Sequence, residues 1–284
     1  MQVVNRKTKE VTEIKEKGIV KYMYENKSGR ILLKILSTRV MANIVRGFMK
    51  TFLSIPYKNK IIKKYNINMD LYEDKKYLCY NTFFIRKLKE LKFDSEKNSF
   101  ISPAESKLLV LKLDKDAKLD IKGSSYTLEE ILEDDIYKEY ENGYALIFRL
   151  EETNYHRYIY IDDGRRDVYK HIKGKLHTVQ PIAYKRYKIF HENTREWTIL
   201  HTKNFGDVIH MEVGAMNIGR ISNNRNTLFK KGDEKGNFEF GGSTIILFVK
   251  DGIINVDEDI LENSKNFMET TVNIGERVAT KKIN

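Results

Sequence analysis

The sequence contains one cysteine, three prolines and no long apolar run that is free of charge. Because Cys79 is alone, an intramolecular disulfide framework and any multi-cysteine zinc or iron–sulfur site are excluded, which suits a reducing compartment. No segment reaches the roughly 18 uncharged apolar residues that a spanning helix needs. The first residues carry charge and lead into no apolar run of secretory length, so we expect no signal peptide. The sequence therefore predicts a chain that does not cross a bilayer and holds no metal.

Basic residues outnumber acidic ones, with 51 Lys and Arg against 40 Asp and Glu and a formal net charge of +11. This balance favours an anionic partner: a nucleic acid, an anionic membrane surface or an acidic substrate. Tyrosines and phenylalanines scattered among the lysines are the one further feature that would suit a nucleic-acid-binding protein. No RNP stretch or zinc finger accompanies them, so we expect no nucleic-acid partner.

An apolar stripe between positions 31 and 53 predicts an amphipathic helix. The stripe recurs at steps of three and four residues, as one face of a helix requires, and consists of Leu33, Leu36, Val40, Ile44, Phe48 and Phe52. Two interpretations stay open: the helix packs on the rest of the protein, or its apolar face enters the lipid headgroup boundary while basic residues meet anionic lipid. Ser54-Ile55-Pro56 ends this helix, and positions 61–65 and 81–91 predict two further short helices.

The residue pattern changes beyond Pro103, where short runs of β-branched and aromatic residues alternate with glycines. We expect strands at 108–113, 144–150, 155–161, 197–201, 208–213 and 244–249. Between them, Thr127 with Glu130 three residues later predicts a helix start with a capping box. The predicted fold class is α+β, with an N-terminal helical segment followed by a β-rich domain.

The sharpest local pattern is KGDEKGNFEFGGST at positions 231–244, followed directly by the apolar run IILF. A glycine-rich turn here presents Ser243 at the mouth of a buried strand. Alone, Gly-Gly-Ser-Thr is most often an ordinary tight turn. In this context it resembles the phosphatidylserine decarboxylase family, whose members carry a Gly-Ser-Thr cleavage site preceded by Lys-Gly-x-Glu-x-Gly-x-Phe.

Other landmarks of that family follow in the family's order through most of the chain. They are FFIRKL at 83–88, ISP at 101–103, IKG at 121–123 with Tyr126, YHR at 155–157, TVQP at 178–181, NTRE at 193–196, FG at 205–206 and VGA at 213–215. The opening NRKT at 5–8, with the helical segment after it, looks like the membrane-facing N-terminal region of clostridial-type members.

The resemblance implies that the chain makes its own pyruvoyl cofactor from Ser243. The hydroxyl attacks the carbonyl of Gly242, an N-to-O acyl shift gives an ester, and β-elimination leaves a dehydroalanine that hydrolyses to the pyruvoyl group. Two chains result, 1–242 and 243–284, which stay associated. The new ketone condenses with the amine of phosphatidylserine as an electron sink, so that carbon dioxide leaves and phosphatidylethanolamine forms.

Two positions depart from the family pattern around the residues that serve this serine. The usual Ser-Pro-x-Asp reads Ser102-Pro103-Ala104-Glu105, which keeps a carboxylate but lengthens it by one methylene. A second histidine, the usual self-cleavage base in many members, is replaced by Ile159. The residue matching His156 contributes to substrate binding and decarboxylation in the family.

The resulting candidate catalytic residues are Ser243, His156 and Glu105, with the cleavage site at Gly242 and Ser243 and with His177 as an alternative base. If positions 155–161 form a strand, His156 cannot replace the missing base by register, because side chains three apart point to opposite faces. Asn193 and Arg195 could hold an anion or order a turn, and both interpretations stay open. For the other histidines, His171, His191, His201 and His210, we expect structural or surface roles.

The resemblance gives the organisation that we expect of the molecule. Residues 1–95 are a mainly helical membrane-associating region, and residues 96–284 are a β-rich decarboxylase domain cut between Gly242 and Ser243. The protein is expected to lie peripherally on the cytoplasmic face of the cell membrane, bound to phosphatidylserine and an anionic surface; homodimer formation stays open. Alternatives are a processing-dead relative that binds lipid or regulates, and a pyruvoyl decarboxylase of another amino-acid substrate.

Overall fold

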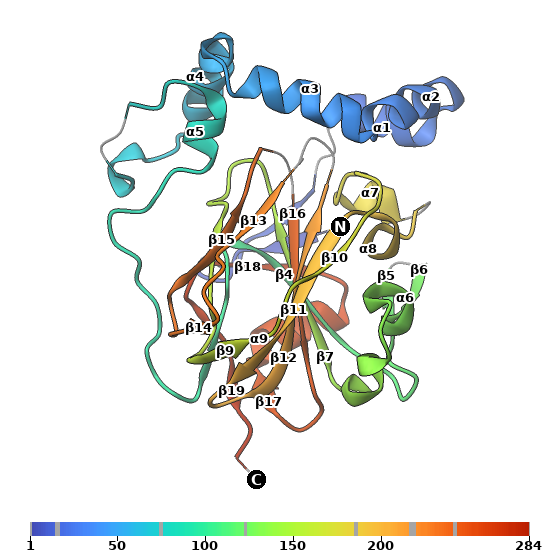
Figure 1. Ribbon diagram of the computed structural model, residues 1–284, viewed down its shortest axis with the longest axis vertical. Helices are drawn as coiled ribbons and strands as arrows, with labels where there is room; N and C mark the ends of the chain where they lie inside the picture. The colour runs from blue at the N-terminus through green and yellow to red at the C-terminus, as the bar shows by residue number, and fades with distance from the viewer. Residues whose placement is uncertain are drawn as a thin grey trace.

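The computed structural model describes residues 2–14, 18–73, 76–121, 124–184, 187–215, 220–240 and 243–283. It confirms a mixture of helices and strands built around one large sheet (Figure 1). In spatial order the sheet runs β14 (Leu228–Phe229), β9 (Gly164–Arg166), β11 (Arg195–Thr202), β12 (Gly206–Gly214), β16 (Ser243–Val249), β7 (Tyr144–Leu150), β4 (Ser106–Lys112), β18 (Glu269–Val272), β1 (Gln2–Val4) and β2 (Val11–Glu13). An additional strand, β10 (Lys170–Ile172), pairs with β11.

Strand β16 is at the centre of this sheet and is buried along its whole length. Its alternate side chains enter two different cores: Ile246 and Phe248 pack in one cluster, whereas Ile245, Leu247 and Val249 pack in the other. A strand covered on both faces reads as a continuous apolar run, which explains the uninterrupted IILF sequence. The expected strands at 108–113, 144–150, 197–201, 208–213 and 244–249 are confirmed as β4, β7, β11, β12 and β16.

Smaller sheets flank the large one. One joins β13 (Ile221–Asn223), β15 (Glu234–Phe238) and β8 (Arg157–Ile159); another joins β17 (Ile254–Val256), β19 (Arg277–Lys281) and β3 (Ser99–Ile101); a third pairs β5 (Lys118–Ile121) with β6 (Ser124–Thr127). The strand expected at 155–161 is therefore shorter than predicted, and His156 precedes it.

The remaining helical elements are α6 (Leu128–Leu132), η3 (Asp135–Tyr140), α7 (Pro181–Tyr184), α8 (Ile189–Glu192) and α9 (Glu258–Lys265). Thr127 caps α6 as predicted, since its Oγ1 accepts from the Glu130 amide at 3.1 Å.

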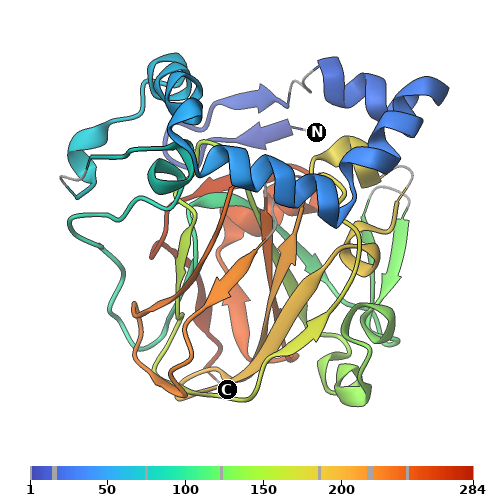
Figure 2. The same ribbon diagram turned by 45° about the horizontal axis from the view of Figure 1, so that its top comes forward.

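Helices from the first third of the chain lie across one end of the sheets (Figures 1 and 2). They are α1 (Gly18–Glu25), α2 (Lys27–Leu36), α3 (Arg39–Met49), η1 (Phe52–Ser54), α4 (Ile55–Lys64), η2 (Met69–Leu71) and α5 (Tyr80–Phe84). The single helix predicted over 31–53 is wrong, because the chain breaks at Ser37 and Thr38, where the Thr38 Oγ1 accepts from the Met41 amide and starts a new helix. Pro56 lies in the first turn of α4, a position that tolerates proline. The helix expected at 81–91 ends at Phe84.

The first residues of the chain are not helical. Strand β1 pairs in parallel with β18, with Val3 opposite Glu269, and β2 pairs with β1. The amino terminus thus belongs to the large sheet, although a mainly helical start was expected. Across the parts of the chain that the structure describes, no helix is both long and apolar enough to cross a bilayer.

Candidate active site

Ser243 is the first residue of β16 and lies between two neighbouring strands, opposite Gly214 of β12 and Leu150 of β7. Its side chain is fully buried, and its Oγ has no hydrogen-bond partner among the described residues. A buried hydroxyl without a partner is unfavourable, and such groups often mark functional positions. Gly242, the other residue of the predicted cleavage site, lies outside the described residues, as does Gly241 before it.

The glycine spacing in KGDEKGNF has structural causes in β15 and the turn before it. Gly232 has φ of +86°, and a Cβ there would come within 2.5 Å of the Phe93 ring. At Gly236 a Cβ would come within 2.4 Å of the Ser222 carbonyl oxygen, so the two strands could not approach. Glu234 pairs with Arg157 of β8 at 2.5 Å. The motif therefore shapes the strand that leads the chain toward Ser243.

Residues just ahead of the predicted cleavage site are held from two sides. The Phe238 amide donates to the His156 carbonyl oxygen at 3.0 Å. The Phe240 ring packs edge-on against Tyr80 of α5, with ring centroids 5.1 Å apart. Lys50, at the end of α3, pairs with Glu239 at 2.9 Å. The helical segment and the turn that carries His156 thus converge on residues 238–240.

His156 is buried and its ring lies against Phe84, with centroids 3.8 Å apart. Its Nδ1 is 2.9 Å from the Asn154 carbonyl oxygen. Because a carbonyl oxygen can only accept, Nδ1 must carry the proton in this bond. In the neutral form of the ring the lone pair is then on Nε2, which is the tautomer that a general base needs.

Among the described residues, the hydrogen bonds of Glu105 go to the turn before His156 and not to the imidazole ring. One carboxylate oxygen accepts from the Asn154 side-chain amide at 2.7 Å, and the other accepts from the Tyr155 amide at 3.1 Å. Asn154 in turn offers the carbonyl that holds His156. The longer side chain of Glu105 is therefore connected to the histidine through Asn154.

Arg86 was quoted from the sequence only as a landmark, yet it is buried at the same turn. Its Nη2 donates to the carbonyl oxygens of Thr153 at 3.1 Å and of Asn154 at 3.4 Å. Its guanidinium lies over the rings of Tyr72 and Phe83, 4.5 and 4.7 Å from their centroids. The sequence signal for this role was the position of Arg86 directly after the apolar and aromatic residues Phe83, Phe84 and Ile85.

His177 lies on the other side of Gly214 from Ser243. Asn193 bonds to the amide and carbonyl of His177 and also donates to the Gly214 carbonyl oxygen at 2.8 Å. The His177 ring stacks on Tyr187 at 4.2 Å. Burial lowers the pKa of His177 below its ordinary value, an effect that Glu192 opposes. The ring is thus kept neutral, within a packed aromatic environment.

Ile159, at the position where the resemblance leads us to expect a histidine base, is a core residue. Ile159 is buried at the end of β8 in the same apolar cluster as Phe238 and Ile245.

Arg195 donates to the carbonyl oxygens of Ile131 and Asn193, so of the two interpretations left open, it orders a turn. The four other histidines bond to or face nearby groups: His171 faces Glu196, His191 bonds to the Glu130 carbonyl, His201 lies between Asp167 and Asp207, and His210 is buried beside Glu212.

A buried ion pair, which no sequence pattern indicated, joins β15 to β12. Lys235 and Glu212 are both fully buried and in contact, and Lys235 also donates to the Asn223 side-chain oxygen at 3.0 Å. Burial raises the pKa of Glu212 and lowers the pKa of Lys235, and their mutual attraction opposes both shifts. Because β15 leads to Ser243 and β12 lies beside it, the pair fixes the approach to the site.

Comparisons with known proteins agree with this arrangement. A family model described as phosphatidylserine decarboxylase matches residues 80–280. "Phosphatidylserine decarboxylase proenzyme 2" of Clostridium acetobutylicum is 48% identical over 282 residues, covering 97% of each chain. "Phosphatidylserine decarboxylase proenzyme" of Clostridium botulinum strain Hall is 38% identical over 98% of each chain, and that of Clostridium beijerinckii is 37% identical over 99% of each. These matches define a decarboxylase of the proenzyme type. The chain belongs to the phosphatidylserine decarboxylase family, which is pyruvoyl-dependent.

Proposed function

We propose that this protein converts phosphatidylserine to phosphatidylethanolamine and carbon dioxide with a pyruvoyl group that it makes from Ser243. The observation that carries the proposal is the position of Ser243, buried and unpartnered among the described residues, at the start of the central strand within the family match. The site fits the group, since a chain end created there would begin in a dry interior strand. Once present, the ketone withdraws electrons from the substrate and so lets carbon dioxide leave.

Self-cleavage needs a strained and well-held turn before the serine. The Ser243 hydroxyl attacks the Gly242 carbonyl, the acyl group moves from nitrogen to oxygen, and β-elimination releases the Gly242 carboxylate. The dehydroalanine left behind takes up water and loses ammonia to give the pyruvoyl end. Anchoring of residues 238–240 by His156, Tyr80 and Lys50 supports this chemistry, because it fixes the chain on the amino-terminal side of the attacked bond.

We assign the acid–base role in substrate turnover to His156 and a positioning role to Glu105. The Nδ1 proton is committed to Asn154, so Nε2 is the atom that exchanges protons. Glu105 and Arg86 hold the turn that orients this ring. His177 remains the alternative base, but the Asn193 bonds and the stacking on Tyr187 favour a structural role.

Replacing each histidine by asparagine separates the two assignments. We expect His156→Asn to slow turnover about 10²- to 10⁴-fold, the usual contribution of a general acid–base group, mainly through kcat. We expect His177→Asn to change processing and turnover by less than about threefold. A time course of chain cleavage on a denaturing gel and steady-state kinetics measure both. Normal turnover in His156→Asn, or stalled cleavage in His177→Asn alone, would reverse the assignment.

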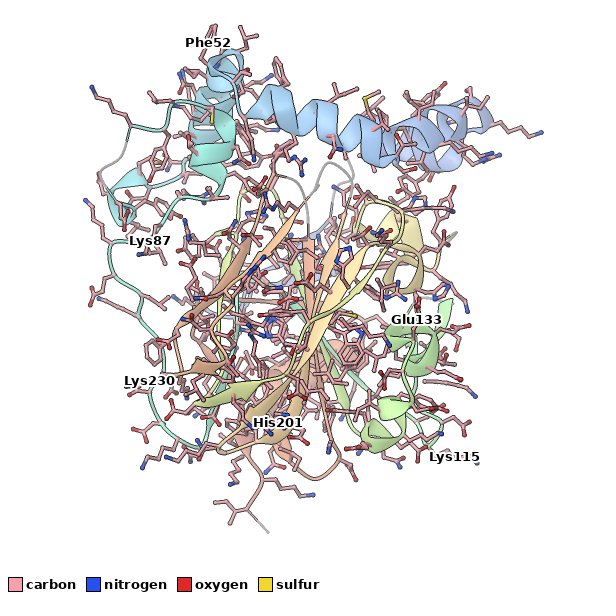
Figure 3. The ribbon with its side chains drawn as sticks, viewed as in Figure 1. Phe52, Lys87, Lys115, Glu133, His201 and Lys230 are labelled. Carbon is pink, nitrogen blue, oxygen red and sulfur yellow. The ribbon has the colours of Figure 1, made fainter. Side chains whose placement is uncertain are left out.

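The membrane surface that we propose for this protein is the outer face of the helical segment. Large apolar side chains are exposed there on successive turns, namely Ile31 and Ile35 of α2, Val40, Ile44 and Phe48 of α3, and Phe52 and Leu53 of η1. Phe52 is 72% exposed and stands at the outermost end of the molecule (Figure 3). Large apolar patches exposed on a protein surface mark interaction sites.

Charge supports a lipid partner for this face. Residues 18–64 contain eleven Lys and Arg residues but one acidic residue, Glu25. A basic helical segment with exposed apolar side chains suits binding to the anionic cytoplasmic face of a membrane, with apolar groups entering the headgroup boundary. Lys50 of the same segment pairs with Glu239, and Ile61 packs in one apolar cluster with Phe240, so lipid bound to the outer face would be near the site.

Introducing charge on this face should weaken membrane binding. We expect Val40→Asp combined with Phe52→Asp to lower affinity for vesicles containing phosphatidylserine about tenfold or more, because each change removes a large apolar side chain from the interface. The matched control is Val168→Asp with Leu228→Asp, which adds the same charges at exposed apolar positions elsewhere. Vesicle co-sedimentation measures the difference. Equal loss in both double variants would show a general charge effect and contradict the assigned face.

The proposed function is tested on the purified wild-type protein. A denaturing gel should show two chains, and borohydride added with phosphatidylserine vesicles should attach the lipid amine covalently to the 243–284 chain. Release of phosphatidylethanolamine and carbon dioxide completes the test. A single uncut chain would favour a processing-dead lipid-binding protein, and turnover of a free amino acid without turnover of the phospholipid would assign another substrate.

A further inference from the structure

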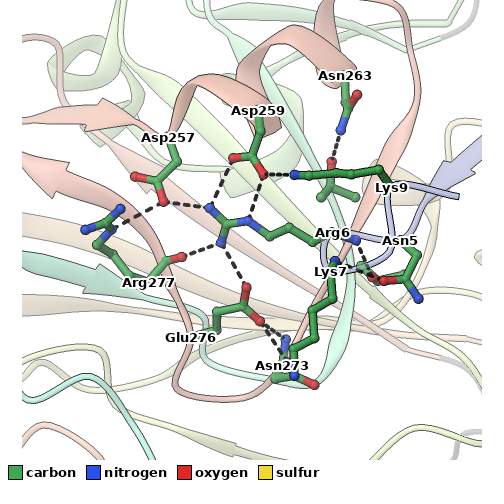
Figure 4. A network of polar contacts seen from close by, with 12 residues as sticks. Asn5, Arg6, Lys7, Lys9, Asp257, Asp259, Asn263, Asn273, Glu276 and Arg277 are labelled. Atoms are coloured by element: carbon green, nitrogen blue, oxygen red, sulfur yellow. Dashed lines mark hydrogen bonds and ion pairs between the residues drawn. The ribbon is translucent and has the colours of Figure 1, made fainter.

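Arg6 lies at the centre of a polar network that joins the two ends of the sequence (Figure 4). Its guanidinium donates to Asp257 at 2.7 Å, to both carboxylate oxygens of Asp259 at 3.0 and 3.1 Å, and to Glu276 at 3.1 Å. It also donates to the Arg277 carbonyl oxygen at 2.5 Å. All the donor groups of one side chain are therefore used on acceptors more than 250 positions away in the sequence.

Every one of these acceptors belongs to residues 243–284, the smaller product of the proposed cleavage. The Arg6 amide adds a bond to the Thr271 hydroxyl at 3.1 Å, also in that segment. The strands interleave in the same way: β18, from the small product, lies between β4 and β1, both from the large product. The hairpin formed by β1 and β2 is therefore the outer neighbour of the small product in the sheet.

We propose that the hairpin of residues 2–13 is a docking surface that helps to retain the small chain in the cleaved enzyme, in addition to the strands beside β16, and that Arg6 makes most of the hairpin's side-chain contacts with that chain. This inference rests on the proposed cleavage, after which only non-covalent contacts retain residues 243–284. Before cleavage the covalent link returns a detached segment at high effective concentration. After cleavage, detachment of this segment separates the chain end that carries the pyruvoyl group from the rest of the enzyme.

The environment of Arg6 makes its contacts strong for a position near the surface. The side chain is 14% exposed and Asp257 is 12% exposed, so both are largely removed from water. Burial would raise the pKa of Asp259, but the Arg6 hydrogen bonds and the charges of Arg6 and Lys9 outweigh it and leave that pKa below its ordinary value. Lys9 makes one contact with Asp259 at 3.3 Å and is 65% exposed, which provides a natural comparison.

The test imposes the cut independently of self-cleavage. A Ser243→Ala chain with a protease recognition sequence inserted before residue 243 is folded, cut by the protease and passed over a gel-filtration column in mild urea. Retention of the small fragment is followed over time, in parallel with the self-cleaved wild-type enzyme. Failure of wild-type protein to cut itself would refute the proposed function but leave this measurement intact.

We expect Arg6→Met to release the small fragment about 10- to 100-fold faster, the range for a partly buried multidentate ion pair. Arg6→Lys should retain only part of the effect, because an ammonium cannot bond to four groups at once. The control Lys9→Met should change release less than about threefold. If Arg6→Met does not fold, Asp257→Asn weakens the same contact from the other chain. Wild-type retention in Arg6→Met or, failing that, in Asp257→Asn, would overturn the proposal.

Discussion

Ser243→Ala is expected to yield a single chain of 33.5 kDa with no pyruvoyl group and no decarboxylase activity. Alanine removes the hydroxyl that must attack the preceding carbonyl, and no other atom at this position can do so. The fold should persist, because Ser243 is buried and its Oγ makes no hydrogen bond to the described residues. Intact-mass measurement and a borohydride assay with phosphatidylserine check the two parts of this expectation.

Thr244→Ala is the matched control for this prediction. Thr244 follows Ser243 in β16, is equally buried, and also has a hydroxyl without a partner among the described residues. We expect this variant to cut itself, because its oxygen belongs to the wrong residue for attack on Gly242. A companion variant, Gly242→Val, should stay uncut because a branched side chain next to the attacked carbonyl obstructs the approach of the Ser243 hydroxyl. Two chains from Ser243→Ala would assign the cleavage to another residue.

The strands of the second half of the chain were predicted well from the sequence, because the pattern of apolar residues there agrees with which side chains are buried. β16 shows the reason: both its faces are covered, so its apolar run cannot be read as anything polar or exposed. The helix over 31–53 was predicted less well. Its apolar stripe continues through Ser37 and Thr38, and the break depends on a local bond from Met41 to Thr38 that competes with the helix.

The candidate site was predicted only in part, for reasons of distance in the sequence. Ser243 was found because its motif is local. The connection from Glu105 through Asn154 to His156 spans about fifty positions, and nothing in either segment indicates the other. The same holds for Arg6 and Arg86, whose partners are set by the folded sheet. Residue types alone could suggest candidates, but the contacts that orient them required the structure.

The second large effect is expected at Arg149, in β7. It forms a fork with Glu269 of β18 at 2.7 and 2.5 Å, across the intervening strand β4, and both side chains are almost fully buried. Burial would lower the pKa of Arg149, but the Glu269 charge outweighs it, so the guanidinium stays ionised. Arg149→Met would leave the Glu269 carboxylate buried without its main partner, which costs about 3–5 kcal/mol of the free energy of unfolding.

This loss is best measured in the Ser243→Ala background, where unfolding involves one chain. Urea unfolding should show a lower midpoint for Arg149→Met with little change in slope. The double variant Arg149→Met with Glu269→Leu should recover much of the loss, because it removes the uncompensated charge together with its partner. As a control, Lys112→Met, which breaks the exposed ion pair between Lys112 at the end of β4 and Asp251 after β16, should cost less than about 1 kcal/mol. A double variant no more stable than Arg149→Met would show that the stability comes from packing around the arginine and not from the pair.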